Sequence, residues 1–167
     1  MDKQLLSKLY EMYQREIYLY LFALCHNDQL AEDLMQETFL KAILSLPEGH
    51  TNMRAWLYLV ARNLYFNYAK KEKVHVPLQR LEEKPDELLT ELPEQVIRNE
   101  RKRLLYEALN SLPQNRREVL LLQYFGGLSQ KEIAAVMHIT PENVRVLAYR
   151  GKRELKIYLE VHGYDIS

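Results

Sequence analysis

The stretch Gly126–Leu155, GGLSQKEIAAVMHITPENVRVLAYRGKREL, contains two helix start signals a short distance apart. Ser129 followed by Glu132 has the spacing of a capping box, so we expect a short helix to begin at Ser129. Thr140 followed by Pro141 repeats the signal, because threonine caps helices and proline is tolerated at the first helical position. The three residues before Thr140 form the predicted turn. The stretch therefore predicts two helices joined by a tight turn.

The second of these helices has two unlike faces. At about 100° per residue, Val144, Ala148, Gly151 and Leu155 share one side, which we expect to pack on the first helix and the turn. A basic row lies opposite, made of Arg145, Val146, Tyr149, Arg150, Arg153 and Lys156. Such a row suits a helix-turn-helix recognition helix, whose first turns meet base edges while flanking cations meet phosphates. A helical hairpin with a solvated basic face is the alternative.

Composition and periodicity predict an all-α chain. Five glycines and six prolines in 167 residues leave few breaks, and 47% hydrophobic residues suffice for ordinary globular cores. The net charge is zero, but residues 1–73 carry nine basic and nine acidic side chains, residues 74–100 three and seven, and residues 101–167 eleven and seven. The C-terminal part is therefore basic, which suits a nucleic-acid partner.

Cysteine usage and hydropathy indicate the compartment. Cys25 is the single cysteine, so no internal disulfide can form, which fits a reducing environment. It follows the apolar Leu21–Leu24, where we expect a buried, inert thiol. No apolar run approaches the roughly 20 residues that span a bilayer, and the N-terminus lacks a signal-peptide core. We expect a cytoplasmic protein that is not itself a membrane protein.

Two helical patterns open the chain. The first is predicted to end near His26 and Asn27, and its apolar face is Leu5, Leu6, Leu9, Tyr13, Ile17, Tyr20, Leu21 and Leu24. The second, LAEDLMQETFLKAILSL, is expected to be capped by Asp28 and to bury Leu34, Phe39, Ala42, Ile43 and Leu46. Its outer face carries Glu32, Asp33, Gln36, Glu37 and Lys41, and charge alone favours a merely solvated face there. Residues 46–52 are a predicted loop.

A third helix, predicted over residues 53–73, mixes aromatic residues with cations and amides. The residues in question are Trp56, Tyr58, Tyr65, Phe66 and Tyr68, interleaved with Arg54, Arg62, Asn63, Asn67, Lys70 and Lys71. This mixture suits single-stranded nucleic acid, because bases stack on rings while phosphates meet the charges. Core packing is the competing explanation for most of the rings. Asn63 and Asn67 share one face at i and i+4, where paired amides can read exposed base edges.

The remaining pattern divides the chain. Three prolines and a cluster of acids over residues 74–93 predict a linker, so we expect domains at residues 1–73 and 96–167 joined by a linker at residues 74–95. Helices over residues 96–110 and 115–124 would support the helix-turn-helix. The five histidines are scattered, and no phosphate loop or nucleophile motif is present, so we expect no metal, no cofactor and no catalytic residue.

Three blocks in this order resemble the extracytoplasmic-function (ECF) sigma factors, a small two-domain class of bacterial RNA polymerase initiation subunits. The blocks are AEDLMQETF at Ala31–Phe39, RAWLYLVARNL at Arg54–Leu64, and the long segment Asn110–Leu155. The resemblance covers nearly the whole chain. It implies a factor that binds core polymerase, recognises minus-35 and minus-10 promoter elements, and starts transcription of a stress- or signal-responsive gene set.

The resemblance also assigns roles to residues. It implies that Asp33, Gln36 and Glu37 contact the β′ clamp helices, and that the loop at residues 46–52 holds a flipped-out base. Minus-10 contacts would come from Asn63, Asn67, Trp56, Arg62, Lys70 and Lys71. Minus-35 contacts would come from Arg145, Val146, Tyr149, Arg150 and Arg153. The β flap and an anti-sigma factor, free or membrane-bound, are further implied partners.

Two departures from the family pattern affect promoter choice. Asn67 stands where many members have aspartate, and Val146, Leu147 and Ala148 stand where serine, arginine and leucine are common. We expect Val146 to make an apolar contact, for example with a thymine methyl, and Leu147 to compensate for the small Ala148. The rival hypotheses are a stand-alone helix-turn-helix regulator and a helical module that binds proteins only.

Overall fold

The computed structural model describes residues 3–45, 52–72 and 100–163. Every regular element within these ranges is a helix, so the prediction of an all-α fold is confirmed. Packing divides the chain into two compact units, Met1–Leu92 and Pro93–Ser167, here called unit 1 and unit 2. The predicted linker at residues 74–95 and residues 46–51 of the predicted loop lie outside the described residues, while the last loop residue, Asn52, is the N-cap of α3.

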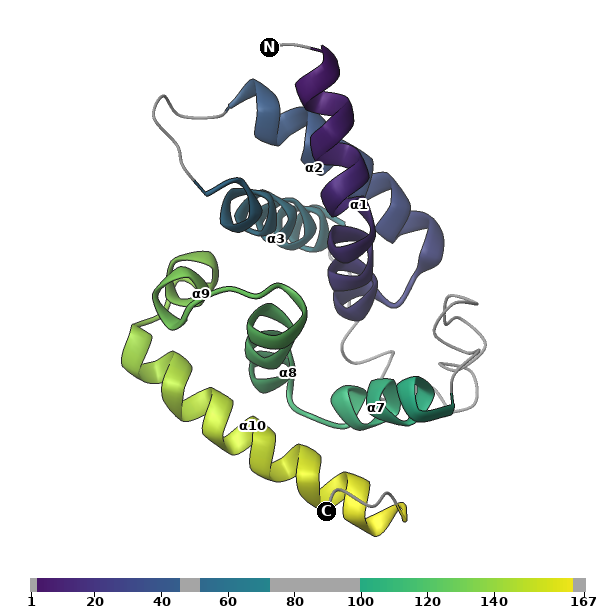
Figure 1. Ribbon diagram of the computed structural model, residues 1–167, viewed down its shortest axis with the longest axis vertical. Coiled ribbons are helices and arrows are strands. Elements are labelled where there is room, and N and C mark those ends of the chain that lie inside the picture. Colours follow the sequence, from purple (N-terminus) through teal and green to yellow (C-terminus); the bar gives the residue numbers. More distant parts are fainter. Residues whose placement is uncertain (1–2, 46–51, 73–99, 164–167) are drawn as a thin grey trace. The chain divides into compact units, whose positions relative to one another are not determined.

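The described part of unit 1 consists of α1 (Lys3–Cys25), α2 (Asp28–Leu44) and α3 (Met53–Lys71), each packed on the other two (Figure 1). Their shared core is aliphatic and aromatic, with Ile17, Leu21, Phe39, Leu57 and Tyr58 almost fully buried. Edge-to-face ring contacts join the helices in pairs: the Tyr20 and Tyr58 centroids are 5.1 Å apart, and those of Tyr10 and Phe39 are 5.2 Å apart. Cys25 is buried, as predicted.

The boundary between α1 and α2 differs from the prediction in one residue. The N-cap of α2 is Asn27, whose side-chain oxygen accepts a hydrogen bond from the Leu30 amide, and not Asp28. Asp28 is instead the first helical residue, and its carboxylate accepts the Tyr18 hydroxyl. The preceding His26 has a φ of 54°, so the chain makes its turn there and Asn27 arrives in the extended conformation of a cap.

Two predicted core positions in unit 1 are also wrong in degree. Leu5 lies in the first turn of α1 and is 43% exposed. Ile43 lies near the end of α2 and is only half-buried. Both residues lie close to helix ends, which apolar periodicity does not distinguish from helix middles.

Two side chains fasten the start of α3 to the rest of unit 1. The Trp56 indole N–H donates to the Ala42 carbonyl of α2 at 2.9 Å. Arg54 forms an ion pair with Glu16 of α1, with Nε 3.2 Å from Oε1, and its guanidinium lies over the Tyr13 ring at 5.3 Å. Burial raises the pKa of Glu16 despite the opposing effects of Arg54 and of the hydrogen bond from Tyr58. The cluster fixes the orientation of α3 relative to α1.

The described part of unit 2 begins with α7 (Glu100–Asn110) and α8 (Gln114–Leu120), which ends in a π-helical turn, η1 (Leu121–Phe125). Next come α9 (Gln130–Met137) and α10 (Pro141–Val161). The predicted capping box is confirmed, because the Ser129 hydroxyl accepts from the Glu132 amide and the Glu132 carboxylate accepts from the Ser129 amide. Thr140 caps α10 and Pro141 is its first residue, also as predicted. His138, at a φ of 59°, makes the turn between α9 and α10.

The packed side of α10 contacts more of unit 2 than predicted. Val144 and Ala148 are buried where α10 meets α9, but a Cβ added at Gly151 would lie 3.1 Å from Leu120 Cδ1 and 3.4 Å from Arg116 Cβ, both on α8. Leu155 packs against a cluster of Leu109, Leu112 and Leu120. The first half of α10 therefore packs on α9, and the second half packs on α7 and α8.

Candidate nucleic-acid interfaces

The outward side of α10 carries the predicted basic row. Arg145, Tyr149, Arg150, Arg153 and Lys156 are exposed, and Tyr149 retains 67% of its accessible surface. Arg145 is held loosely by Glu142 at 3.6 Å, and its side chain is 69% exposed. Surface ion pairs of this kind contribute little, so Arg145 is available to another anion.

The second departure from the family pattern, at residues 146–148, lies on α10. Val146 is exposed on the basic row, whereas Leu147 and Ala148 are both buried. Lys152, one position before Arg153, belongs to a different side of the helix, because its ammonium lies over the Tyr124 ring at 5.2 Å. Tyr124 and its neighbour Phe125, both in η1, are more than half exposed, and the sequence alone predicted no role for them.

A groove runs between α2 and α3 of unit 1. A hollow of about 250 Å³ is lined by Lys41, Ser45, Trp56, Val60, Asn63, Leu64 and Asn67. A second hollow, of about 610 Å³, is lined by Leu34, Glu37, Lys41, Leu64, Asn67, Tyr68, Lys70 and Lys71. The two share Lys41, Leu64 and Asn67, so they adjoin, and we name them together the strand groove. Five of the six residues predicted for the minus-10 element line it.

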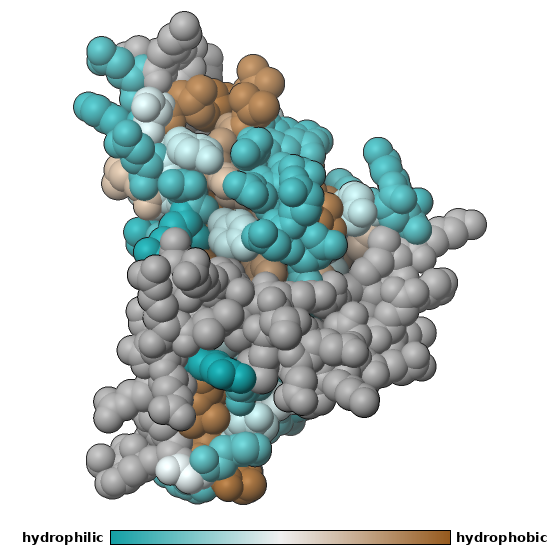
Figure 2. Space-filling view, turned by 90° about the vertical axis from the view of Figure 1, so that its right-hand side faces the viewer, coloured by the Kyte–Doolittle hydropathy of each residue, from teal (hydrophilic) through white to brown (hydrophobic). Residues whose placement is uncertain are grey.

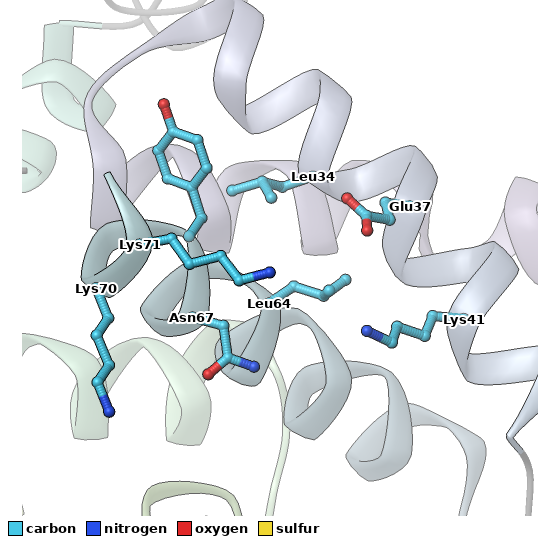
Figure 3. A pocket seen from close by; sticks show the side chains of 8 residues that line it. Leu34, Glu37, Lys41, Leu64, Asn67, Lys70 and Lys71 are labelled. Atoms are coloured by element: carbon cyan, nitrogen blue, oxygen red, sulfur yellow. The ribbon is translucent and has the colours of Figure 1, made fainter. Parts of the chain in front are cut away.

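The close-up in Figure 3 shows how the larger hollow is built. Lys41 and Lys71 reach into it from α2 and α3, Glu37 lies on the α2 side and Asn67 on the α3 side, and Lys70 points away from the others. The hydrophobic residues beneath are Leu34 and Leu64, both buried. The groove thus combines an apolar floor with cationic and amide groups at its rim, a combination that suits bases and phosphates together.

Arg62 is the predicted minus-10 residue that does not line the strand groove. Its guanidinium lies 4.5 Å above the Phe66 ring, on a different side of α3 from Asn63 and Asn67. Helical geometry explains the separation, because a residue immediately before Asn63 points about 100° away from it. Conversely, Lys41 and Ser45 line the groove from α2. Lys41 was predicted only to be exposed, since no pattern within α2 reveals which helix packs beside it.

The three residues predicted to bind polymerase are exposed on α2 but do not form one cluster. Asp33 accepts a hydrogen bond from Gln29 at 3.0 Å. Gln36 lines a hollow of about 620 Å³ against α1, together with Leu6, Tyr10, Phe39 and Leu40, whereas Glu37 lines the strand groove. Exposed Leu40 and Leu44 continue the same outer face, and Figure 2 shows apolar side chains gathered amid polar ones on the surface of unit 1.

Among residues 3–45, 52–72 and 100–163, there is no group of three or more His, Cys, Asp or Glu side chains that could hold a metal ion. Within the same ranges, no helix has both the length and the hydropathy required to cross a membrane.

Family models match both units. The model described as Sigma-70 region 2 matches residues 9–74, and the one described as Sigma-70, region 4 matches residues 102–155. The chain is similar to the ECF RNA polymerase sigma factor SigM of Bacillus subtilis, with 31% identity over 90% of this chain and 93% of the relative. It is also similar to the RNA polymerase sigma factor YlaC of the same organism, with 34% identity over 90% of each chain.

Solved structures show the same fold. The sigma factor RpoE of Bartonella quintana, in complex with the anti-sigma factor NepR, aligns with a TM-score of 0.68 at 21% identity, over 93% of this chain and 96% of that one. CnrH, in complex with the cytosolic domain of CnrY, aligns with a TM-score of 0.67 at 20% identity, over 96% of this chain and 90% of that one. Matches to two sigma domains and to full-length relatives show that the chain belongs to the ECF sigma factors, non-enzymatic subunits that direct RNA polymerase to promoters and initiate transcription.

Proposed function

We propose that the two units of this sigma factor divide promoter recognition, with the strand groove of unit 1 holding the minus-10 element as a single strand and α10 of unit 2 reading the minus-35 element as a duplex. The observation that supports the proposal is the presence of two unlike surfaces with cationic side chains, one on each unit. One is a groove with an apolar floor, and the other is a convex basic row.

The strand groove suits unpaired bases. Asn63 and Asn67 offer amide donors and acceptors along one face of α3, and Trp56 offers a half-buried ring at one end. Lys70 and Lys71 lie in the last turn of α3, where cations also interact favourably with the helix dipole. Unpaired bases expose the edges that amides read, and stacking on a ring supplies about 1–3 kcal/mol per base. We assign Arg62 to a phosphate outside the groove.

The convex row of α10 suits a duplex. A major groove about 12 Å wide admits one α-helix, and its base edges face the first turns of a recognition helix. Arg145, Val146 and Tyr149 lie in those turns, and Arg150 and Arg153 follow. We assign base contacts to Arg145, Val146 and Tyr149, and phosphate contacts to Arg153. Arg150 lies between these residues and can contact either a base or a phosphate.

We assign partner proteins to the remaining surfaces. The outer face of α2, with Asp33, Gln36 and Glu37, would take the β′ clamp helices of core polymerase, and the exposed Tyr124 and Phe125 would take the β flap. A cognate anti-sigma factor, free or membrane-bound, would cover one or more of these surfaces. The aligned RpoE was solved in complex with the anti-sigma factor NepR, and the aligned CnrH with the cytosolic domain of CnrY. Work with polymerase implies a cytoplasmic location and a regulon that responds to stress or to a signal.

Run-off transcription tests the proposal. Transcripts sequenced after overexpression supply a candidate promoter, and purified core polymerase is then assayed on it with and without the chain. We expect a defined start only when the chain is present, with shared elements upstream at minus-10 and minus-35. A stand-alone regulator would bind the DNA without supplying a start to core polymerase, and that result would reject the proposal.

A further inference from the structure

The strand groove has a second wall that its proposed role does not yet use. α3 supplies the amides and the terminal lysines, but α2 supplies Lys41 to both hollows and Glu37 to the larger one. The two α2 residues are one helical turn apart, on the same edge of the helix. Each carries a full charge, and the two charges are opposite.

The positions of the charged groups favour one phosphate at the centre of the larger hollow. Lys41 and Lys71 enter it from opposite helices (Figure 3), and both are exposed at its rim. The buried Leu34 and Leu64 line the floor between them, and low-dielectric walls strengthen electrostatic interactions compared with bulk water. Asn67 lies beside this point, where its amide can reach the base attached to the same phosphate.

Glu37 acts against such an anion. Its carboxylate shares the hollow with Lys41 and Lys71, so it repels a phosphate that the lysines attract. A carboxylate beside two lysines lowers the affinity for the phosphate backbone, which is the same for every DNA sequence. The choice between bases then depends more on the neighbouring Asn67 amide.

We propose that Lys41 and Lys71 clamp a single phosphodiester of the unpaired strand, and that Glu37 weakens this clamp. The inference rests on the proposed minus-10 role of the groove and adds to it two α2 residues with opposite effects. It also assigns Glu37 to strand binding, in addition to the proposed polymerase contact.

Holoenzyme reconstituted from core polymerase and the full chain provides the test. The probe is a fluorescent fork promoter with a single-stranded non-template minus-10 overhang, and its affinity is measured at several salt concentrations. Lys41→Gln should lower the magnitude of the salt slope by about 0.7, which corresponds to about fivefold weaker binding near 0.1 M salt. Glu37→Gln should strengthen binding by about two- to fivefold, because it removes one repulsive charge. Lys8→Gln is the matched control, since it removes an equal charge from an exposed position on α1 outside the groove.

Core-polymerase affinity of each variant is measured in parallel. If wild-type holoenzyme binds the fork and starts transcription but Lys41→Gln keeps the wild-type affinity and slope, the clamp is wrong and the proposed function stands. If wild-type holoenzyme fails to start at all, the proposed function itself fails. Loss of core affinity in Lys41→Gln, with strand affinity unchanged, would mean that an acidic polymerase segment occupies the hollow and would overturn the proposal. Glu37→Gln variants that lose only core affinity would overturn its second half.

Discussion

Arg145 and Arg153 lie about two turns apart on the same exposed row of α10, and their positions predict different defects. Arg145 is in the second turn, where a recognition helix meets base edges, so Arg145→Ala should relax specificity at one minus-35 position by about 1 to 3 kcal/mol. Arg153→Ala should weaken binding to all sequences and reduce the salt slope by about one. Competition binding against single-base variants of the minus-35 duplex distinguishes the two defects. Equal effects on every duplex from both substitutions would contradict the assignment.

Gly151 is required by the closeness of α10 to α8. A methyl group there would meet Leu120 at 3.1 Å and the Arg116 Cβ at 3.4 Å. Overpacking costs about 1–3 kcal/mol, whereas alanine gains about 1 kcal/mol in helix propensity over glycine. We expect Gly151→Ala to destabilise unit 2 by about 1 kcal/mol, and Gly151→Val to cost more.

Hydrogen exchange of the α8 and α10 amides measures this cost within unit 2 alone. Arg153→Ala is the control for stability, because a substitution at an exposed position usually changes it by less than about 0.5 kcal/mol. A Gly151→Ala variant as stable as wild type would show that Leu120 moves aside without loss.

Residue-level prediction from the sequence worked where chemistry is local. The capping box at Ser129 and the cap at Thr140 depend on residues three apart, and both are confirmed. The role of a side chain was harder to predict where it depends on packing against another helix. Arg62 was grouped with Asn63 by composition although it lies over Phe66, and Lys41 was left without a role because its position beside α3 is a tertiary fact.

At the scale of helices, the ties between α1 and α3 make a prediction about pH. Burial is the largest influence on Glu16 and raises its pKa above the usual 4.5, so the folded chain binds this proton more tightly than the unfolded chain. The contribution of Glu16 to the free energy of unfolding is therefore fully present below pH 4.5 and is lost as pH rises through the folded pKa. Glu16→Gln should consequently gain stability relative to wild type as pH increases over this window.

Urea denaturation followed by far-ultraviolet circular dichroism at a series of pH values measures the difference. Unit 2 is the same in the wild type and in Glu16→Gln, so its contribution to the unfolding signal cancels when the two are compared. Glu107→Gln, in a more exposed i,i+4 pair with Arg103 on α7, is the control and should show no corresponding trend. A Glu16→Gln variant that loses stability as pH rises would mean that the attraction of Arg54 outweighs burial.

Helix order was predictable because apolar periodicity covers most of the described residues, and α1, α2, α3, α9 and α10 all have their predicted counterparts. The π-helical turn after α8 was not predictable. It is closed by the hydrogen bond from the Gly126 amide to the Leu121 carbonyl, and such a wider turn leaves no mark in a period of 3.6. The exposure of Tyr124 and Phe125 within this turn was not predicted either.

At the scale of the whole chain, division into two units predicts that covalent linkage contributes to promoter affinity. Separate fragments of residues 1–92 and 93–167 should each keep one activity, polymerase binding for the first and minus-35 duplex binding for the second. Mixed together at about 10 micromolar, they should start transcription about 100-fold less efficiently than the intact chain, because linkage supplies an effective concentration of about 1 millimolar. Run-off yield against fragment concentration measures this, and full activity of the dilute mixture would contradict it.

The Trp56 indole, held in place by its hydrogen bond to the Ala42 carbonyl, makes intrinsic tryptophan fluorescence a probe of the strand groove. Trp56 is the single tryptophan of the chain, it is half-buried, and it lines the strand groove. A nucleobase stacked nearby would quench its emission, whereas none of the residues lining this groove belongs to α10. Occupancy of one promoter element can therefore be followed in real time on the unlabelled protein.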